Sequence, residues 1–335
     1  MSGGGIEARV RRSLYGARRW HPAEIVFWIL AVAAFFLLPR QLLILNEIAI
    51  LGLFAVSLDL ILGYAGIVSL GHAAFFGFGA YAAGLFAKHA SADPLVGLAV
   101  GMGAAGLLGL LTSPLILRGS DLTRLMVTLG VALILGELAN SLGWLTGGAD
   151  GLQGIVMGPV LGLFEFDIFG KVAYLYSLAV LFVLFVLARR IVGSPFGLSL
   201  RAIRDNPLRA SASGVPLHWR LVAVYALAAA YAGAAGALLA QTTQFVSLDV
   251  LAFHRSADLM LVLIIGGVGY LYGGLIGAVA FKLLQDVIAS FTPQYWMFWI
   301  GLFLVLFVLG GRELIHGGIK AVVGRVARLG RRSPT

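Results

Sequence analysis

Cysteine is missing from this 335-residue chain, and charged residues are scarce. Without cysteine the chain can hold no disulfide, no thiolate-bound metal and no cysteine nucleophile. Charged residues make up 12% of the sequence, whereas ordinary soluble domains carry about 25%. Hydrophobic residues make up 60% of it. The composition therefore predicts a polytopic membrane protein rather than a soluble domain.

Two motifs that would indicate chemistry on this chain are also absent. No G-x-x-x-x-G-K-[ST] loop occurs, so we do not expect the chain to bind ATP through a phosphate loop. No H-E-x-x-H motif occurs and the six histidines are scattered, which argues against an intramembrane metalloenzyme. We therefore expect a protein that is not an enzyme, with no catalytic, cofactor-binding or metal-binding residues.

The net charge of +9 does not indicate a nucleic-acid surface, because the basic residues lie between apolar runs. Five arginines occur in the first 22 residues, and other basic residues gather at 189–220 and beyond 311. By the positive-inside rule, these patterns place both tails and the central loop in the cytoplasm. An even number of membrane crossings must then separate each pair of basic regions.

Ten apolar segments can supply those crossings. They lie near 23–38, 42–62, 66–87, 94–117, 121–143, 171–192, 217–240, 257–270, 273–291 and 295–311. The segment 257–270 is shorter than the roughly 20 residues that span a bilayer, so it either re-enters or breaks within the membrane. The first segment follows a basic region, as a signal peptide would, but the residues directly before Pro39 and Arg40 do not form a small-x-small cleavage pattern, which favours an uncleaved span.

The expected organisation is therefore an all-α polytopic membrane protein with about ten transmembrane segments and cytoplasmic termini. We divide it into a basic tail at 1–22, one transmembrane domain at 23–312 and a basic tail at 313–335. Within the transmembrane domain, residues 193–216 form a cytoplasmic loop.

Glycine is dense in two apolar stretches, 63–85 and 264–278. We expect their small residues to let helices pack closely. The glycines assigned to packing are Gly66, Gly71, Gly77, Gly79, Gly266, Gly267 and Gly269. Two such stretches in corresponding halves of the chain favour a transport pathway at the interface between two repeats.

Polar side chains interrupt these stretches. Ser69 and His72 lie three residues apart and would share one face of a helix. Because burying polar atoms in lipid without partners is costly, each needs a role. With Tyr81 and Asp258, they are candidates for lining a translocation pathway. The alternative is that they form hydrogen bonds between packed helices.

At this point the residues resemble a known family. The run LGYAG at 62–66, with SLGHAAFF at 69–76 and GAY at 79–81, is similar to the hallmark of LivM-type permease subunits of branched-chain amino-acid ABC importers. Further agreeing blocks are RG at 118–119, TLG at 128–130, LTGG at 145–148, GL at 151–152, GGVG at 266–269, GG at 273–274 and GA at 277–278. The resemblance covers about residues 40 to 311.

The resemblance implies a permease like that of type II ABC importers, in a bacterial inner membrane. It implies leucine, isoleucine and valine as substrates, with urea, short amides or aromatic acids as alternatives. The implied partners are a LivH-type permease subunit in a heterodimer, two cytoplasmic ABC ATPases that hydrolyse the ATP, and a periplasmic or extracellular solute-binding protein. Besides these, we expect contact with lipid and none with nucleic acid.

The segment SPFGLSLRAIRDNPLRASASGV at 194–215 resembles the loop by which such permeases dock on their ATPases. We expect one short helix over 198–213. The predicted coupling residues are Arg201, Ala202, Ile203, Arg204, Asp205, Asn206 and Gly214. The alternative is that these arginines only mark topology near lipid headgroups.

A rival class is a secondary transporter driven by protons or sodium. It would need ionisable residues within the membrane, and the candidates are Asp59, Glu137, Asp258, Lys282 and Asp286. Lys282 and Asp286 are spaced i,i+4 and can neutralise one another on a helix.

Overall fold

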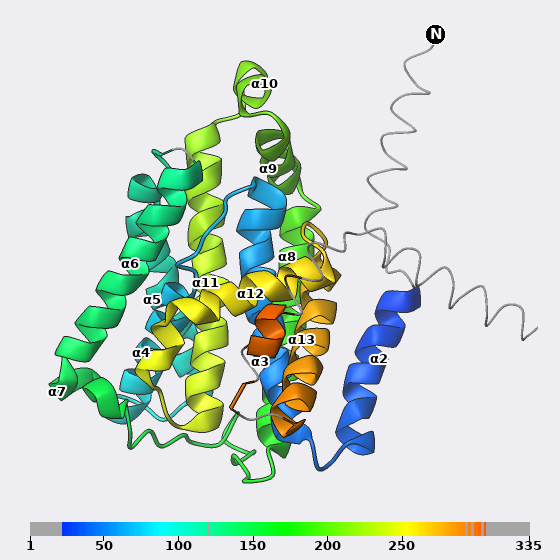
Figure 1. The fold of residues 1–335 in the computed structure, drawn as a ribbon. Helices are drawn as coiled ribbons and strands as arrows, with labels where there is room; N and C mark the ends of the chain where they lie inside the picture. The colour runs from blue at the N-terminus through cyan, green and yellow to red at the C-terminus, as the bar shows by residue number, and fades with distance from the viewer. Residues whose placement is uncertain (1–21, 120, 292–293, 296–297, 303–304, 306–335) are drawn as a thin grey trace, which may run out of the picture. The chain divides into compact units, whose positions relative to one another are not determined.

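The computed structural model describes residues 22–119, 121–291, 294–295, 298–302 and 305 (Figure 1). The regular structure of these residues is helical, with isolated bridges at Leu152–Val246 and Val160–Phe164. The elements are α2 (Pro22–Leu37), α3 (Leu42–Ala65), α4 (Ala73–His89), α5 (Pro94–Ile116), α6 (Asp121–Ser141), α7 (Gly143–Thr146), η1 (Gly148–Asp150), α8 (Lys171–Val192), α9 (Pro195–Asp205), α10 (Pro207–Ala212), α11 (Leu217–Thr243), η2 (Leu248–Leu251), α12 (Phe253–Gly266) and α13 (Leu271–Phe291).

Six described helices are long and apolar enough to cross a membrane, namely α3, α5, α6, α8, α11 and α13. Helices α2, α4 and α12 have 16, 17 and 14 residues, which is less than the roughly 20 that span a bilayer. The chain is therefore an all-helical, multi-pass membrane protein. Both predicted tails and most of the predicted segment 295–311 lie outside the described residues, so the count of ten remains a prediction.

The chain forms two compact units, Met1–Phe281 and Lys282–Thr335, and helix α11 lies at the centre of the first. It packs against α3, α4 and α5. A Cβ on Gly236 would lie 1.9 Å from the carbonyl oxygen of Phe76 in α4, and one on Gly233 would lie 2.3 Å from the Cβ of Ala105 in α5. These positions leave no room for a side chain, so the helices meet backbone to backbone.

Helices α3 and α11 are the most buried of the candidate spans among the described residues. In the most apolar stretch of α3, 83% of the residues are buried, against 17% in α6. A helix that is apolar all round and buried lies inside a bundle, while one that is apolar and exposed faces lipid or a partner. Helix α3 is therefore an interior element.

The predicted continuous span at 66–87 is broken in the structure. Helix α3 ends at Ala65, where Gly66 is left-handed (φ 73°) and the N–H of Ile67 donates to the carbonyl of Ile61 at 2.9 Å. The N–H of Gly66 also donates to the carbonyl of Leu62 at 3.2 Å, which is the bond of an αL cap. Residues 66–72 are not helical, and α4 begins at Ala73. The prediction that Ser69 and His72 share a helical face is therefore wrong.

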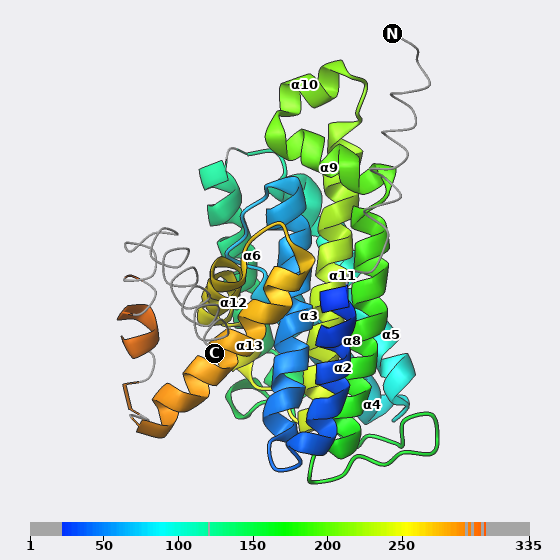
Figure 2. The same ribbon diagram turned by 90° about the vertical axis from the view of Figure 1, so that its right-hand side faces the viewer.

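The predicted single helix over 198–213 is also wrong, because two helices occupy the segment. Asn206 separates them in an extended conformation (φ −160°, ψ 102°), and its side chain accepts from the N–H of Arg209 at 3.0 Å. A residue before proline is disfavoured in a helix, and Pro207 starts α10. Figures 1 and 2 show α9 and α10 together beyond one end of α8 and α11.

Candidate functional site: a junction at the end of helix α3

Helix α9 has a buried face and an exposed face. Leu200 and Ile203 are buried, and α9 packs against α3, α8 and α11. Gly197 allows this approach, since a Cβ there would lie 2.1 Å from the carbonyl oxygen of Val192. On the other side the Asp205 side chain is 70% exposed, and Leu208 at the start of α10 is 83% exposed. The segment is thus anchored on one side and open on the other.

Two arginines of α9 turn toward α3. Arg204 donates from Nη1 to the carbonyl oxygen of Gly63, and the guanidinium carbon of Arg201 lies 5.1 Å from the ring centre of Tyr64. The last carbonyls of a helix lack partners within it, and a positive charge is favourable there. These arginines therefore attach α9 to the end of α3, a contact that the sequence resemblance did not indicate.

One turn earlier, Asp59 joins α3 to the second glycine-rich stretch. Its side chain is fully buried, and Oδ1 accepts from the N–H of Gly269 at 2.7 Å. A Cβ on Gly63 would lie 2.6 Å from that nitrogen, so the contact requires glycine at 63. We define the coupling junction as Asp59, Gly63, Arg204 and Gly269, contributed by α3, α9 and the α12–α13 connection.

The non-helical segment 66–72 is held by side chains from other helices. The N–H of Leu70 donates to Thr128 Oγ1 of α6 at 3.3 Å, and the N–H of Ala73 donates to Ser256 Oγ of α12 at 2.9 Å. Irregular backbone within a membrane protein is tolerated only where its polar groups find such partners. The segment is therefore a built element of the bundle interior.

His72 ends this segment with its ring buried against α3. Its Nε2 lies 2.9 Å from Ser57 Oγ, and its ring stacks on Phe54 with centroids 5.7 Å apart. Ser57 Oγ donates to the carbonyl of Phe54 at 2.5 Å, so its lone pairs are left to accept the Nε2–H of His72. These contacts fit the alternative in which His72 bonds packed helices.

The four candidate pathway residues lie in different surroundings. Ser69 and His72 are buried in the segment 66–72, and the largely buried Tyr81 lines a 320 Å³ cavity between α4, α6 and α7. Asp258 on α12 is partly exposed, and the charged groups near it are His254, Arg255 and Asp249. Arg255 is itself paired with Asp249 at 2.6 Å. The pathway assignment remains a prediction.

The seven glycines assigned to packing fall into two groups. Gly71, Gly77, Gly79 and Gly266 leave no room for a side chain. A Cβ on Gly71 would lie 1.9 Å from the carbonyl oxygen of Thr128, for example, and one on Gly79 would lie 2.3 Å from the Cα of Gly233. By contrast Gly66, Gly267 and Gly269 have positive φ angles of 73°, 100° and 82°. In that second group, backbone conformation accounts for the glycine.

The remaining predicted coupling residues lie along the same segment. Ala202 is exposed on α9, Asn206 caps α10, and Gly214 turns the chain toward α11 with φ 82°. Asp205 accepts from Arg204 at 3.3 Å on the surface. Their role in docking an ATPase remains a prediction.

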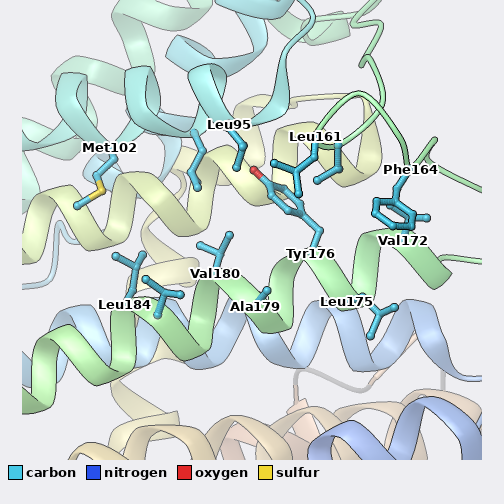
Figure 3. Close-up of a pocket in the computed structure, with 13 residues that line it drawn as sticks. Leu95, Met102, Leu161, Phe164, Val172, Leu175, Tyr176, Ala179, Val180 and Leu184 are labelled. Carbon is cyan, nitrogen blue, oxygen red and sulfur yellow. The ribbon is translucent and has the colours of Figure 1, made fainter.

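A 520 Å³ cavity between α5, α8 and residues 160–164 is apolar (Figure 3). Tyr176 is its one lining residue with a side-chain hydroxyl, and that hydroxyl lies 3.0 Å from Gln241 Oε1. Sites for polar ligands need convergent polar groups. The lining therefore offers little for recognising an amino acid.

Comparison with known protein families covers α3, α9 and the α12–α13 connection. A family model described as "Branched-chain amino acid transport system / permease component" matches residues 41–308. The chain belongs to this family. The match includes both glycine-rich stretches and the α9–α10 segment, and therefore every residue of the coupling junction. No solved structure matches the chain.

Two curated relatives carry the name high-affinity branched-chain amino acid transport system permease protein LivM. The protein from Salmonella typhimurium LT2 is 30% identical over 288 residues, covering 78% of this chain and 65% of the relative. The one from Escherichia coli K12 is 27% identical over 317 residues, covering 85% and 72%. The chain thus spans slightly less than two thirds of the Salmonella relative. The resemblance to LivM-type permeases is confirmed.

Proposed function

We propose that this chain is a membrane-spanning permease subunit of an ATP-driven ABC importer in a bacterial inner membrane. The family match and the names of the two relatives support branched-chain amino acids as the cargo. The alternative cargoes are those that the family resemblance also implies, namely urea, short amides and aromatic acids.

In this proposal the chain hydrolyses no ATP itself. It pairs with a LivH-type permease subunit, receives substrate from an external solute-binding protein and is driven by two cytoplasmic ABC ATPases. The observation that carries the proposal is the α9–α10 segment, which projects between two membrane spans and is attached to the buried α3 by Arg204. A projecting segment fixed to the bundle interior is suited to transmit force.

Asp205 and Leu208 are the residues to change in a test of docking, because their side chains are exposed. Arg201 and Arg204 instead contact α3. We expect the double change Asp205→Ala with Leu208→Ala to lower ATPase recruitment on reconstitution with the partner subunits. The loss should be on the order of tenfold, as for exposed side chains that become buried in an interface. Leu163→Ala, at an equally exposed leucine in the 152–170 connection, is the control. Normal recruitment by the double variant would contradict the docking assignment.

A further inference from the structure

The two glycine-rich stretches meet at the end of α3, where α9 also attaches. Asp59 binds the amide of Gly269, and the ring of Tyr64 lies against the guanidinium of Arg201. Asp59 of α3 therefore holds the connection before α13. Two side chains of α9 hold the same turn of α3.

The hydrogen bond to Gly269 does not by itself explain why a carboxylate occupies position 59. An asparagine or serine would accept from the Gly269 amide without bringing a charge into the bundle, and a buried charge is costly unless it is paired. Arg204 of α9 donates from Nη1 to the carbonyl oxygen of Gly63, one turn of α3 beyond Asp59. Asp59 Oδ2 has no hydrogen-bond partner among the described residues. The carboxylate therefore lies in the part of α3 that α9 holds, and it binds the α12–α13 connection itself.

The α12–α13 connection, which binds Asp59 through the Gly269 amide, contains glycines suited to a hinge. Gly267 and Gly269 both have positive φ, and a Cβ on Gly267 would meet no atom within 4 Å. Hinges are short connecting segments that absorb changes in φ and ψ. A displacement of Gly269 would thus be taken up between α12 and α13.

We propose that Asp59 is a positioning residue that transmits movement of α9 to the α12–α13 connection. Through the hydrogen bond of Arg204 to Gly63 the end of α3 that carries Asp59 follows α9, and through the Gly269 amide the connection follows the carboxylate. Movement of α9 then reaches both glycine-rich stretches, 63–85 and 264–278, together. This inference rests on the proposed function, since it assigns the route from the ATPase-facing segment to the membrane helices.

The first test compares Asp59→Asn and Asp59→Ala in the complex reconstituted with its partner subunits. The measured quantity is substrate transported per ATP hydrolysed, which a smaller folded fraction would not change because both rates fall together. We expect normal ATPase recruitment and a ratio lowered on the order of tenfold in Asp59→Ala. Asp59→Asn, which keeps the shape, should lower it less. Glu137→Gln, a carboxylate change on α6, is the control, and an unchanged ratio in both Asp59 variants would overturn the proposal.

A second test needs no ATPase and therefore separates this inference from the proposed function. Because the chain has no cysteine, spin labels at Leu198→Cys on α9 and Val268→Cys in the connection are unique, and both sites are exposed. We expect a narrow distance distribution that broadens in Asp59→Ala and stays narrow in Glu137→Gln. A distribution that is equally narrow in Asp59→Ala would overturn the proposal. Failure of the wild-type complex to recruit ATPases would instead count against the proposed function.

Discussion

The two helix breaks of this chain differ in how far the bundle encloses them. The first connection, 66–72, has seven residues without an exposed side chain and carries its own polar groups, Ser69 and His72. The second connection, 267–270, has four residues, of which Val268 and Tyr270 are exposed. The N–H of its Gly269 donates to Asp59 of α3, as the N–H of Leu70 in the first connection donates to Thr128 of α6. The first connection is therefore enclosed by the bundle, and the second has two exposed side chains.

Glycine occurs in both connections, but for different physical reasons. In the first connection Gly71 is needed for space, because the backbone of α6 lies against it. In the second, Gly267 is needed for a backbone conformation that residues with side chains rarely adopt. Glycine density alone therefore does not distinguish a tight contact from a hinge.

The largest effect should come from filling the space at the first connection. Gly71→Leu would bring a side chain against the carbonyl of Thr128, where even a Cβ would lie 1.9 Å away. We expect a loss of stability above about 3 kcal/mol, because backbone on both sides must move. Ala87→Leu, near the end of α4, is the matched control. Folded yield in detergent would be measured by size-exclusion chromatography, and equal yields would refute the space-filling explanation.

A smaller effect should follow from removing the polar side chain of the first connection. His72→Ala takes away the stacking on Phe54 and the hydrogen bond to Ser57, so we expect a loss of about 2 to 4 kcal/mol. A double-mutant cycle with Ser57→Ala should show a coupling of about 0.5 to 1.5 kcal/mol. The measurement is thermal unfolding of the purified chain. If stability is normal and only transport falls, His72 belongs to the pathway instead.

The positions of most helices were predictable because apolar runs bounded by loop residues mark membrane spans. Residues 42–62 and 94–117 were predicted, and the helices are Leu42–Ala65 and Pro94–Ile116. The break at 66–72 was not placed, because the apolar run continues through it and its cause is a cap at Gly66. The split at Asn206 has a local signal in Pro207, because a residue before proline is disfavoured in a helix.

The coupling junction could not be derived from sequence patterns. Asp59 and Gly269 are 210 positions apart, and no helical period links residues at that distance. The sequence did single out Asp59 as an ionisable residue in an apolar run, and Gly269 as one of a glycine-dense stretch. The structure adds that these two signals meet, and that Arg204 meets them.

The smallest effect should come from the second connection, where space is available. Gly267→Ala meets no neighbouring atom within 4 Å, so its cost is the φ of 100° alone. With ψ at 121° the residue lies outside the left-handed helical region, and such a sparsely populated conformation costs a residue with a Cβ about 1 to 3 kcal/mol. Gly103→Ala is the matched control, since Gly103 is helical, has ordinary φ and is equally open. There alanine should stabilise by up to about 1 kcal/mol.

The pair of alanine variants therefore separates conformation from space. Thermal unfolding of both variants should show opposite signs, with Gly267→Ala less stable than wild type and Gly103→Ala more stable. If Gly267→Ala is as stable as Gly103→Ala, then the second connection adopts other conformations at little cost. Its positive φ would then not explain the glycine, and the contrast between a space-limited first connection and a conformation-limited second one would fail. Opposite signs would show that glycine is required at 267 for its positive φ and not for space.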